Sequence, residues 1–320
     1  MKSGKLIFPA LWLIALITFY PTIGAGFVFD FLGWQRQYDQ GSFADILTSF
    51  GYKGNHQVLH FFFYSIYGLF HTRGLPWYVL FCSLHAFNAW LLYHWLTDVS
   101  KRWKVQLPAL LILLTSIVFV IHPYNVEPVV WKVCVHYLLS LSAVLALLLW
   151  TGQYLDTGRK WFLWAGLGVY ALSLFLLELS YVTPAVITLY VLIHHFAGAE
   201  HKPEFNRALL LPAGMWGLLV AGLLINRLTL GAWVGHYGSA AHLKLDVIGM
   251  MSTEIKYLVS HLTDARYFSF KIKSVLFDTV LSNPELIFFI LTAIIGIIIL
   301  YVIRFKKVGP HIHLAFFGVS

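Results

Sequence analysis

Long apolar runs alternate with short polar segments along this 320-residue chain. Several runs approach the roughly 20 apolar residues that a helix needs to cross a bilayer. Glycine, proline or charged residues separate one run from the next. The pattern predicts an all-α integral membrane protein with about eight or more spanning helices, at residues 6–28, 77–97, 107–122, 130–150, 161–177, 181–197, 208–225 and 285–304.

Composition excludes a soluble globular protein. Hydrophobic residues make up 59% of the chain, charged residues only 11%, and the mean hydropathy is +0.74. A typical soluble domain is about a quarter charged. The two cysteines, Cys82 and Cys134, lie in or beside apolar segments without metal-ligand spacing and are expected to be core residues. We expect residues 1–320 to form one membrane domain.

The basic residues set the expected orientation. The net charge is +8 and the pI about 9.3, but no nucleic-acid motif is present, and Lys and Arg mostly flank apolar runs. With a cytoplasmic N-terminus, twelve of the 22 fall in short cytoplasmic loops and the other ten in longer outer loops. We therefore expect an inner or plasma membrane protein, or one of the endoplasmic reticulum, whose cytoplasmic cations are Lys2, Lys5, Lys101, Arg102, Lys104, Arg159, Lys160, Lys202, Arg207, Arg304, Lys306 and Lys307.

Two apolar segments are better interpreted as helices that lie in the outer interface. Residues 57–70 are too short to span, and counting them would move the basic stretch at 101–104 to the outside. In residues 245–262 the apolar residues recur every three to four positions, and Glu254, Lys256 and His261 interrupt them. The outer loops are then about 30–76 and 226–284. We expect the apolar stretch at 311–320 to belong to a span that continues beyond it.

Ionisable residues gather on the predicted outer face. Three acids, Asp30, Glu127 and Glu178, lie at span ends or turns on that side. Such groups at membrane depth are costly and usually mark function. More ordinary roles stay open: Asp30 ending a span, Glu127 bracing a turn, and the histidines anchoring at the interface. The polar residues that accompany the acids are Asn55, His56, His122, Lys132, His136, Arg227, His236, Tyr237 and His242.

These residue types suit one kind of chemistry. A carboxylate can take the proton of an acceptor hydroxyl, and cations can stabilise a departing phosphate. The sequence holds no HExxH motif, no Gly-rich phosphate loop and no nucleophilic triad. The arrangement favours group transfer from a charged, lipid-linked donor.

Four segments in order then suggest a family. They are "FVFD" at 27–30, "LHAFNAWLLY" at 84–93, "FVIHPYNVEPVVW" at 119–131 and "LELSYVTP" at 177–184. Over about residues 10–200 the chain resembles the GT-C class of multi-span glycosyltransferases. The similarity is greatest to the TPR-bearing transmembrane O-mannosyltransferases and their bacterial relatives, and the His-Pro…Glu…Trp turn is its most specific part.

The resemblance implies an inverting glycosyltransferase with a GT-C-like bundle and interfacial helices in its first outer loop. A polyprenyl-phosphate-linked sugar would donate to a hydroxyl of a protein or glycan acceptor on the extracytoplasmic face. Asp30 would be the base, with Glu127 and Glu178 lining the site.

The chain also departs from the family pattern. Phe31 stands where a second acid is usual, which argues against a bound divalent metal. Leu177, Val135 and Tyr137 replace a lysine, an arginine and an aspartate, so Lys132, His136, Arg227 or His56 would have to serve the donor phosphate. No cofactor is expected. The alternatives are an inactive GT-C-like scaffold subunit of a membrane complex and a transporter or lipid flippase.

Overall fold

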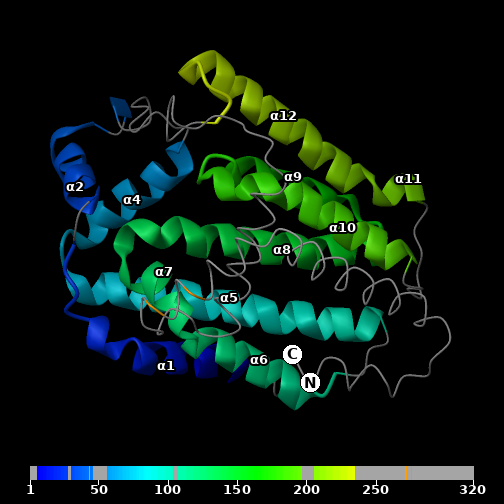
Figure 1. Ribbon diagram of the computed structural model, residues 1–320, viewed down its shortest axis with the longest axis horizontal. Coiled ribbons are helices and arrows are strands. Elements are labelled where there is room, and N and C mark those ends of the chain that lie inside the picture. The colour runs from blue at the N-terminus through cyan, green and yellow to red at the C-terminus, as the bar shows by residue number, and fades with distance from the viewer. Residues whose placement is uncertain are drawn as a thin grey trace. The chain divides into compact units, whose positions relative to one another are not determined.

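The described part of the protein is helical throughout. The computed structural model describes residues 6–27, 30–42, 44–45, 56–103, 107–196, 205–234, 271 and 275. The chain divides into two units, Met1–Ala241 and His242–Ser320, and nearly all described residues belong to the first (Figure 1). Its helices are α1 (Ile7–Thr18), η2 (Tyr20–Thr22), α2 (Asp30–Gln40), α4 (Gln57–Phe70), α5 (Gly74–Arg102), α6 (Ala109–Ile121), η4 (Pro123–Asn125), α7 (Val126–Val130), η5 (Lys132–Cys134), α8 (Val135–Thr157), α9 (Lys160–Ser173), η6 (Glu178–Val182), α10 (Thr183–Phe196), α11 (Phe205–Ala208) and α12 (Leu210–Leu230).

Helices α5 and α8 form the centre of this unit and run in the same direction. Asn88 Nδ2 of α5 donates to the carbonyl of Leu138 near the start of α8, at 2.9 Å. Arg102 at the end of α5 reaches Asp156 at the end of α8, at 2.6 Å. The bundle therefore has two ends. We call the end where α5 and α8 begin the site end, and the end where they finish the basic end.

Four helical segments are long and apolar enough to cross a membrane, and up to five if a bent pair counts as one. They are Gly74–Arg102, Lys132–Thr157, Glu178–Phe196 and Phe205–Leu230, and the bent pair joins Ala109–Ile121 to Pro123–Val130 at 47°. By length and apolar composition these segments are compatible with a membrane protein, and they coincide with five of the eight predicted spans when the bent pair is counted as one.

The other three predicted spans do not coincide with helices of spanning length among the described residues. Helix α1 has 12 residues and α9 has 14, which at 1.5 Å per residue is about 18 and 21 Å, short of a hydrocarbon core of about 30 Å. Pro21 follows α1 and, having no backbone N–H, cannot continue it. Residues 285–304, 245–262 and 311–320 lie outside the described residues. A helix over 57–70 is confirmed as α4, whereas its interfacial position stays a prediction.

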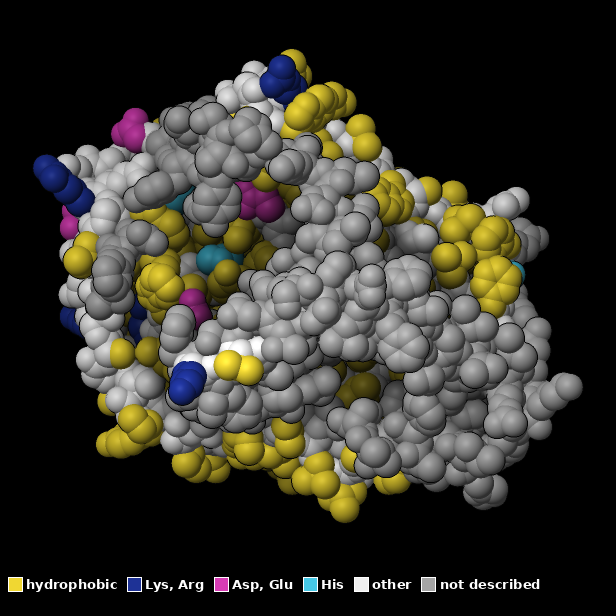
Figure 2. Space-filling view, in the orientation of Figure 1, with side chains coloured by type: hydrophobic (Ala, Val, Ile, Leu, Met, Phe, Trp, Pro, Cys, Tyr) yellow, Lys and Arg dark blue, Asp and Glu magenta, His cyan; other side chains and the backbone are white. Residues whose placement is uncertain are grey.

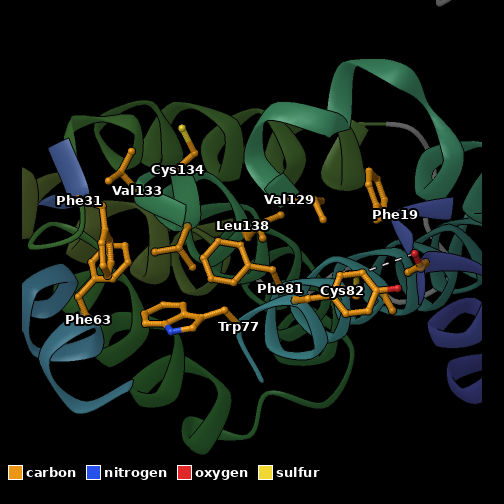
Figure 3. Packing of buried hydrophobic residues seen from close by; sticks show 14 of the residues in the cluster. Phe19, Phe31, Phe63, Trp77, Phe81, Cys82, Val129, Val133, Cys134 and Leu138 are labelled. Atoms are coloured by element: carbon orange, nitrogen blue, oxygen red, sulfur yellow. Dashed lines mark hydrogen bonds between the residues drawn. The ribbon is translucent and has the colours of Figure 1, made fainter. Parts of the chain in front are cut away.

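Two hydrophobic clusters hold the unit together. The first joins α1, α2, α4, α5 and the turn before α8, and includes Trp77, Phe63 and Phe31. Figure 3 shows these three rings close together on one side of the cluster. The second lies among α8, α9, α10 and α12, around Tyr170, Leu211 and Met215. The first cluster fixes α2 and α4 over the site end.

A glycine turn at the basic end connects α8 to α9. Gly158 has φ 63°, in the left-handed region that favours glycine. A Cβ atom there would also clash with the guanidinium of Arg207, which donates to the Gly158 carbonyl. The tight turn brings α9 back beside α8, so that α9 ends at the site end.

Candidate functional site

An ion pair connects α4 to the turn between α9 and α10. His56 Nε2 lies 3.7 Å from Glu178 Oε1, and the two side chains are 7% and 22% exposed. The backbone N–H of Val58 donates to the carbonyl of Phe175 at 3.2 Å, which holds the two segments together. Burial strengthens such a pair because water screens it less. The structure thus brings together two predicted site residues that are 122 positions apart.

A buried amide on α12 reaches the same turn. Asn226 Nδ2 donates to the Tyr181 hydroxyl at 2.8 Å and to the Trp233 carbonyl at 3.3 Å. Tyr181 belongs to the same short helix, η6, as Glu178. Asn226 is not among the site residues predicted from the sequence. It is nevertheless the one amide in the apolar run 209–226, and a buried amide normally has a hydrogen-bonding task.

A second histidine lies one turn further along α4. His60 is 4% exposed, and its Nδ1 lies 3.1 Å from the Tyr38 hydroxyl of α2. Burial, and then the nearby His56, lower the pKa of His60 to about 4. His60 is therefore neutral at physiological pH. The contact of His60 with Tyr38 connects α4 to α2. His56, four residues earlier in the chain, contacts Glu178.

Lys132 is the most deeply buried cation in the predicted set. It belongs to η5, is 3% exposed, and its ammonium lies 5.3 Å from the centre of the Phe81 ring. Three ion pairs join described residues to one another, and Lys132 takes part in none of them. Helix α2, which begins at Asp30, packs against η5. Lys132 thus lies beneath the element that carries the predicted base.

The turn between α6 and α8 uses its other predicted residues for local structure. His122 Nδ1 accepts a hydrogen bond from the Tyr124 N–H at 3.3 Å and caps η4. His136 Nδ1 lies 2.9 Å from the Val133 carbonyl. Glu127 is exposed in the first turn of α7. The two histidines therefore have a structural part in the turn, which sequence reasoning could not separate from binding.

The remaining predicted residues have varied settings. Arg227 is exposed, donates to the Gly231 carbonyl at the end of its own helix and lies 5.9 Å from the Trp233 ring. Asp30 is the first residue of α2, and its side chain is outside the description. Four further predicted residues lie wholly outside the described residues: Asn55, His236, Tyr237 and His242.

Phe31 is a core residue. It is 1% exposed and contacts the rings of Phe27, Phe63, Tyr67 and Trp77, at centroid distances of 4.3 to 6.2 Å. A carboxylate at this position would be buried among aromatic rings at a high energetic cost. Within the part of the chain that the structure describes, no group of three or more His, Cys, Asp or Glu side chains could hold a metal ion.

An apolar groove begins beside the ion pair. Its volume is about 430 Å³, and its walls come from α4, α5, α8 and α9. Val58 and Leu176 line it, each two residues from a member of the His56–Glu178 pair. The lining hydroxyls of Ser142 and Ser173 are bonded to backbone carbonyls. The groove therefore offers a hydrocarbon surface next to a polar, ionisable end.

The surface view shows the same neighbourhood. In Figure 2, on the side where Figure 1 places α2, α4 and α7, a hollow contains histidine and acidic side chains among hydrophobic ones. A hollow that mixes ionisable and apolar groups in this way suits an amphiphilic ligand.

Comparison with known proteins gives this chain no relatives: no family model, no curated protein and no solved structure matches it.

Proposed function

We propose that the protein is a GT-C-like membrane glycosyltransferase that moves a sugar from a polyprenyl-phosphate donor to an acceptor hydroxyl on the extracytoplasmic face. The observation that carries the proposal is the apolar groove that adjoins the buried His56–Glu178 pair. A lipid-linked sugar needs both a hydrocarbon surface and a polar end within one site.

The proposed chemistry is a single displacement. Asp30 takes the proton of the acceptor hydroxyl, whose oxygen attacks the anomeric carbon of the sugar. The bond between that carbon and the phosphate oxygen breaks, and the phosphate leaves with the electron pair. Glu178, paired with His56, and Glu127 would line the sugar side of this reaction. No metal ion has a role in the scheme.

The arrangement of charge supports the proposed orientation. Arg102, Arg159, Lys160 and Arg207 all lie where helices meet at the basic end. Positive residues concentrate in short cytoplasmic loops. The site end would then face away from the cytoplasm, in the inner or plasma membrane or the endoplasmic reticulum.

An inactive scaffold subunit is the second candidate, and Phe31 favours it. The position at which the resembled family usually has a second acid is here a core aromatic residue. A protein that kept the bundle but lost catalysis would show such a replacement. In this case the site end would bind a partner subunit in place of a substrate.

The test is a transfer assay on the purified protein in liposomes. Polyprenyl-phosphate-linked hexoses would be supplied with serine- and threonine-containing peptides and with simple glycosides as acceptors. We expect release of polyprenyl phosphate together with a glycosylated acceptor. If the wild-type protein releases neither with any donor of the panel, the scaffold reading replaces the enzyme.

The groove provides a matched pair of variants for this assay. Ala143→Phe narrows the groove, whereas Ala109→Phe adds the same bulk to an exposed position at the start of α6. Overpacking costs about 1–3 kcal/mol, or roughly 5- to 150-fold in the affinity for a long-chain donor. Equal donor affinity in the two variants would show that the groove does not bind the donor.

A further inference from the structure

Lys132 has a setting that a folded protein rarely gives to a lysine. It lies in η5, between the turn residue Trp131 and the start of α8, and is 3% exposed. Its ammonium lies over the ring of Phe81, 5.3 Å from the ring centre. None of the carboxylates described in the structure forms an ion pair with it.

Such a group is costly unless something binds it. Buried ammonium groups are normally paired or hydrogen-bonded, because the loss of water is otherwise uncompensated. A ring face offsets only a small part of that cost. By contrast, the buried guanidinium of Arg102 lies between two carboxylates, Asp98 and Asp156. Lys132 therefore has an unmet requirement for an anion.

We propose that Lys132 binds the single phosphate group of a lipid-linked ligand. The anion site follows from the buried ammonium itself, while the identity of the ligand as the sugar donor rests on the proposed glycosyltransferase function. In that reaction the phosphate oxygen gains the electron pair of the broken sugar–oxygen bond. The ammonium of Lys132 stabilises this growing charge and needs no transfer of its own proton.

The count of positive groups favours a monophosphate over a diphosphate. Lys132 is a single point charge with three donors, and His56 is already paired with Glu178. Diphosphates are usually held by several cations or by a metal ion. Within the described ranges no cluster of three metal-ligating side chains exists. One buried ammonium matches one phosphate group.

Binding of short lipid analogues to the full-length protein in detergent tests the proposal. The ligands are farnesyl phosphate, farnesyl diphosphate, farnesol and inorganic phosphate, and the quenching of tryptophan fluorescence reports binding. The variants are Lys132→Met and, as a matched control, Lys160→Met, which removes an exposed lysine at the basic end.

We expect Lys132→Met to weaken the binding of farnesyl phosphate about 10- to 100-fold, the usual effect of losing a hydrogen bond to a charged group. Farnesol should bind both variants within about twofold of the wild type. The melting temperature of Lys132→Met should stay the same or rise, because an unpaired buried charge is removed.

Other results would overturn the proposal. Unchanged farnesyl phosphate binding by Lys132→Met removes the anion site. Equal binding of farnesyl phosphate and its diphosphate removes the preference for one phosphate, and equal binding of inorganic phosphate removes the lipid. If Lys132→Met unfolds, Lys132→Arg provides the test, and loss of phosphate binding in that charged variant argues against a cation site.

The two proposals can fail separately. Farnesyl phosphate binding that depends on Lys132, without sugar transfer from any donor, would support the anion site and contradict the enzyme. Sugar transfer that survives Lys132→Met at the wild-type rate and donor affinity would support the enzyme and contradict the anion site.

Discussion

The two ends of the bundle treat charge in opposite ways. At the basic end, Arg102 donates to Asp98 at 3.1 Å and Asp156 at 2.6 Å, and also to the Gly152 carbonyl. At the site end, Lys132 is buried and no described carboxylate forms an ion pair with it, while Glu178 faces His56 at 3.7 Å. Carboxylates neutralise the buried cation at the basic end, whereas no described carboxylate pairs with the buried cation at the site end.

The difference distinguishes a charged group that stabilises the fold from one that remains able to bind a ligand. A guanidinium held by two carboxylates and a carbonyl has few donors left for a ligand, so the Arg102 cluster acts as a brace between α5 and α8. A buried ammonium that no described carboxylate pairs with keeps the capacity to bind an anion. Changes at the two ends should therefore alter different properties of the protein.

The largest effect is expected from Asp30→Asn. Loss of the proposed general base should lower sugar transfer about 10²- to 10⁴-fold, because the acceptor hydroxyl keeps its proton. The melting temperature should change little. Initial rates of transfer in liposomes measure the effect, and a rate equal to that of the wild type would remove Asp30 as the base.

Arg102→Met tests the opposite end. It leaves Asp98 and Asp156 without their common partner, and since these carboxylates are partly exposed we expect a loss of about 2 kcal/mol of unfolding free energy, below the range for fully buried pairs. Lys101→Met, at the exposed neighbouring position, is the control. Chemical unfolding in mixed micelles measures the difference. A loss of farnesyl phosphate binding with intact stability would contradict the division between the two ends.

His60 should make the α2–α4 contact sensitive to acid. Its pKa is about 4 in the folded protein, against about 6.5 when unfolded, so at intermediate pH only the unfolded state takes up the proton. The contribution to stability is complete above pH 6.5 and is lost as the pH falls toward 4. At pH 5 the loss is about 2 kcal/mol.

The comparison of unfolding at pH 7.5 and pH 5 checks this expectation. His60→Gln can keep the hydrogen bond to Tyr38 but cannot titrate, so its stability should change less between the two pH values. The same pH dependence in His60→Gln and the wild type would assign the effect to other groups.

The smallest effect is expected from Glu178→Gln. Losing the charge opposite His56 should lower sugar transfer about fivefold, in line with about 1 kcal/mol for a pair at this distance. A double-mutant cycle with His56→Gln measures the coupling between the two side chains. Additive effects in that cycle would show that the contact does not contribute to transfer.

Sequence patterns predicted much of the fold. Long apolar runs with charge between them gave α5, α8, α10 and α12, because a bilayer selects for length and hydropathy, which are properties of the sequence itself. The first predicted span extends to residue 28, whereas α1 ends at Thr18. Its apolar run continues past Pro21, and hydropathy alone does not register the missing backbone donor.

The site was harder to predict. Selecting polar residues in apolar surroundings found His56, Glu178 and Lys132, but it could not indicate that the first two are paired and the third is not, since pairing depends on packing between distant segments. His122 and His136 met the same criterion and turned out to bond to their own turn. The groove has no sequence signature, because its lining residues resemble those of any apolar helix.

The burial of Phe31 limits how this protein can evolve. Its ring contacts those of Phe27, Phe63, Tyr67 and Trp77, which come from three separate segments of the chain. A single-step change to aspartate would place a carboxylate inside this cluster and lose the packing of the ring. A second acid beside Asp30 would therefore require accompanying changes in the neighbouring rings.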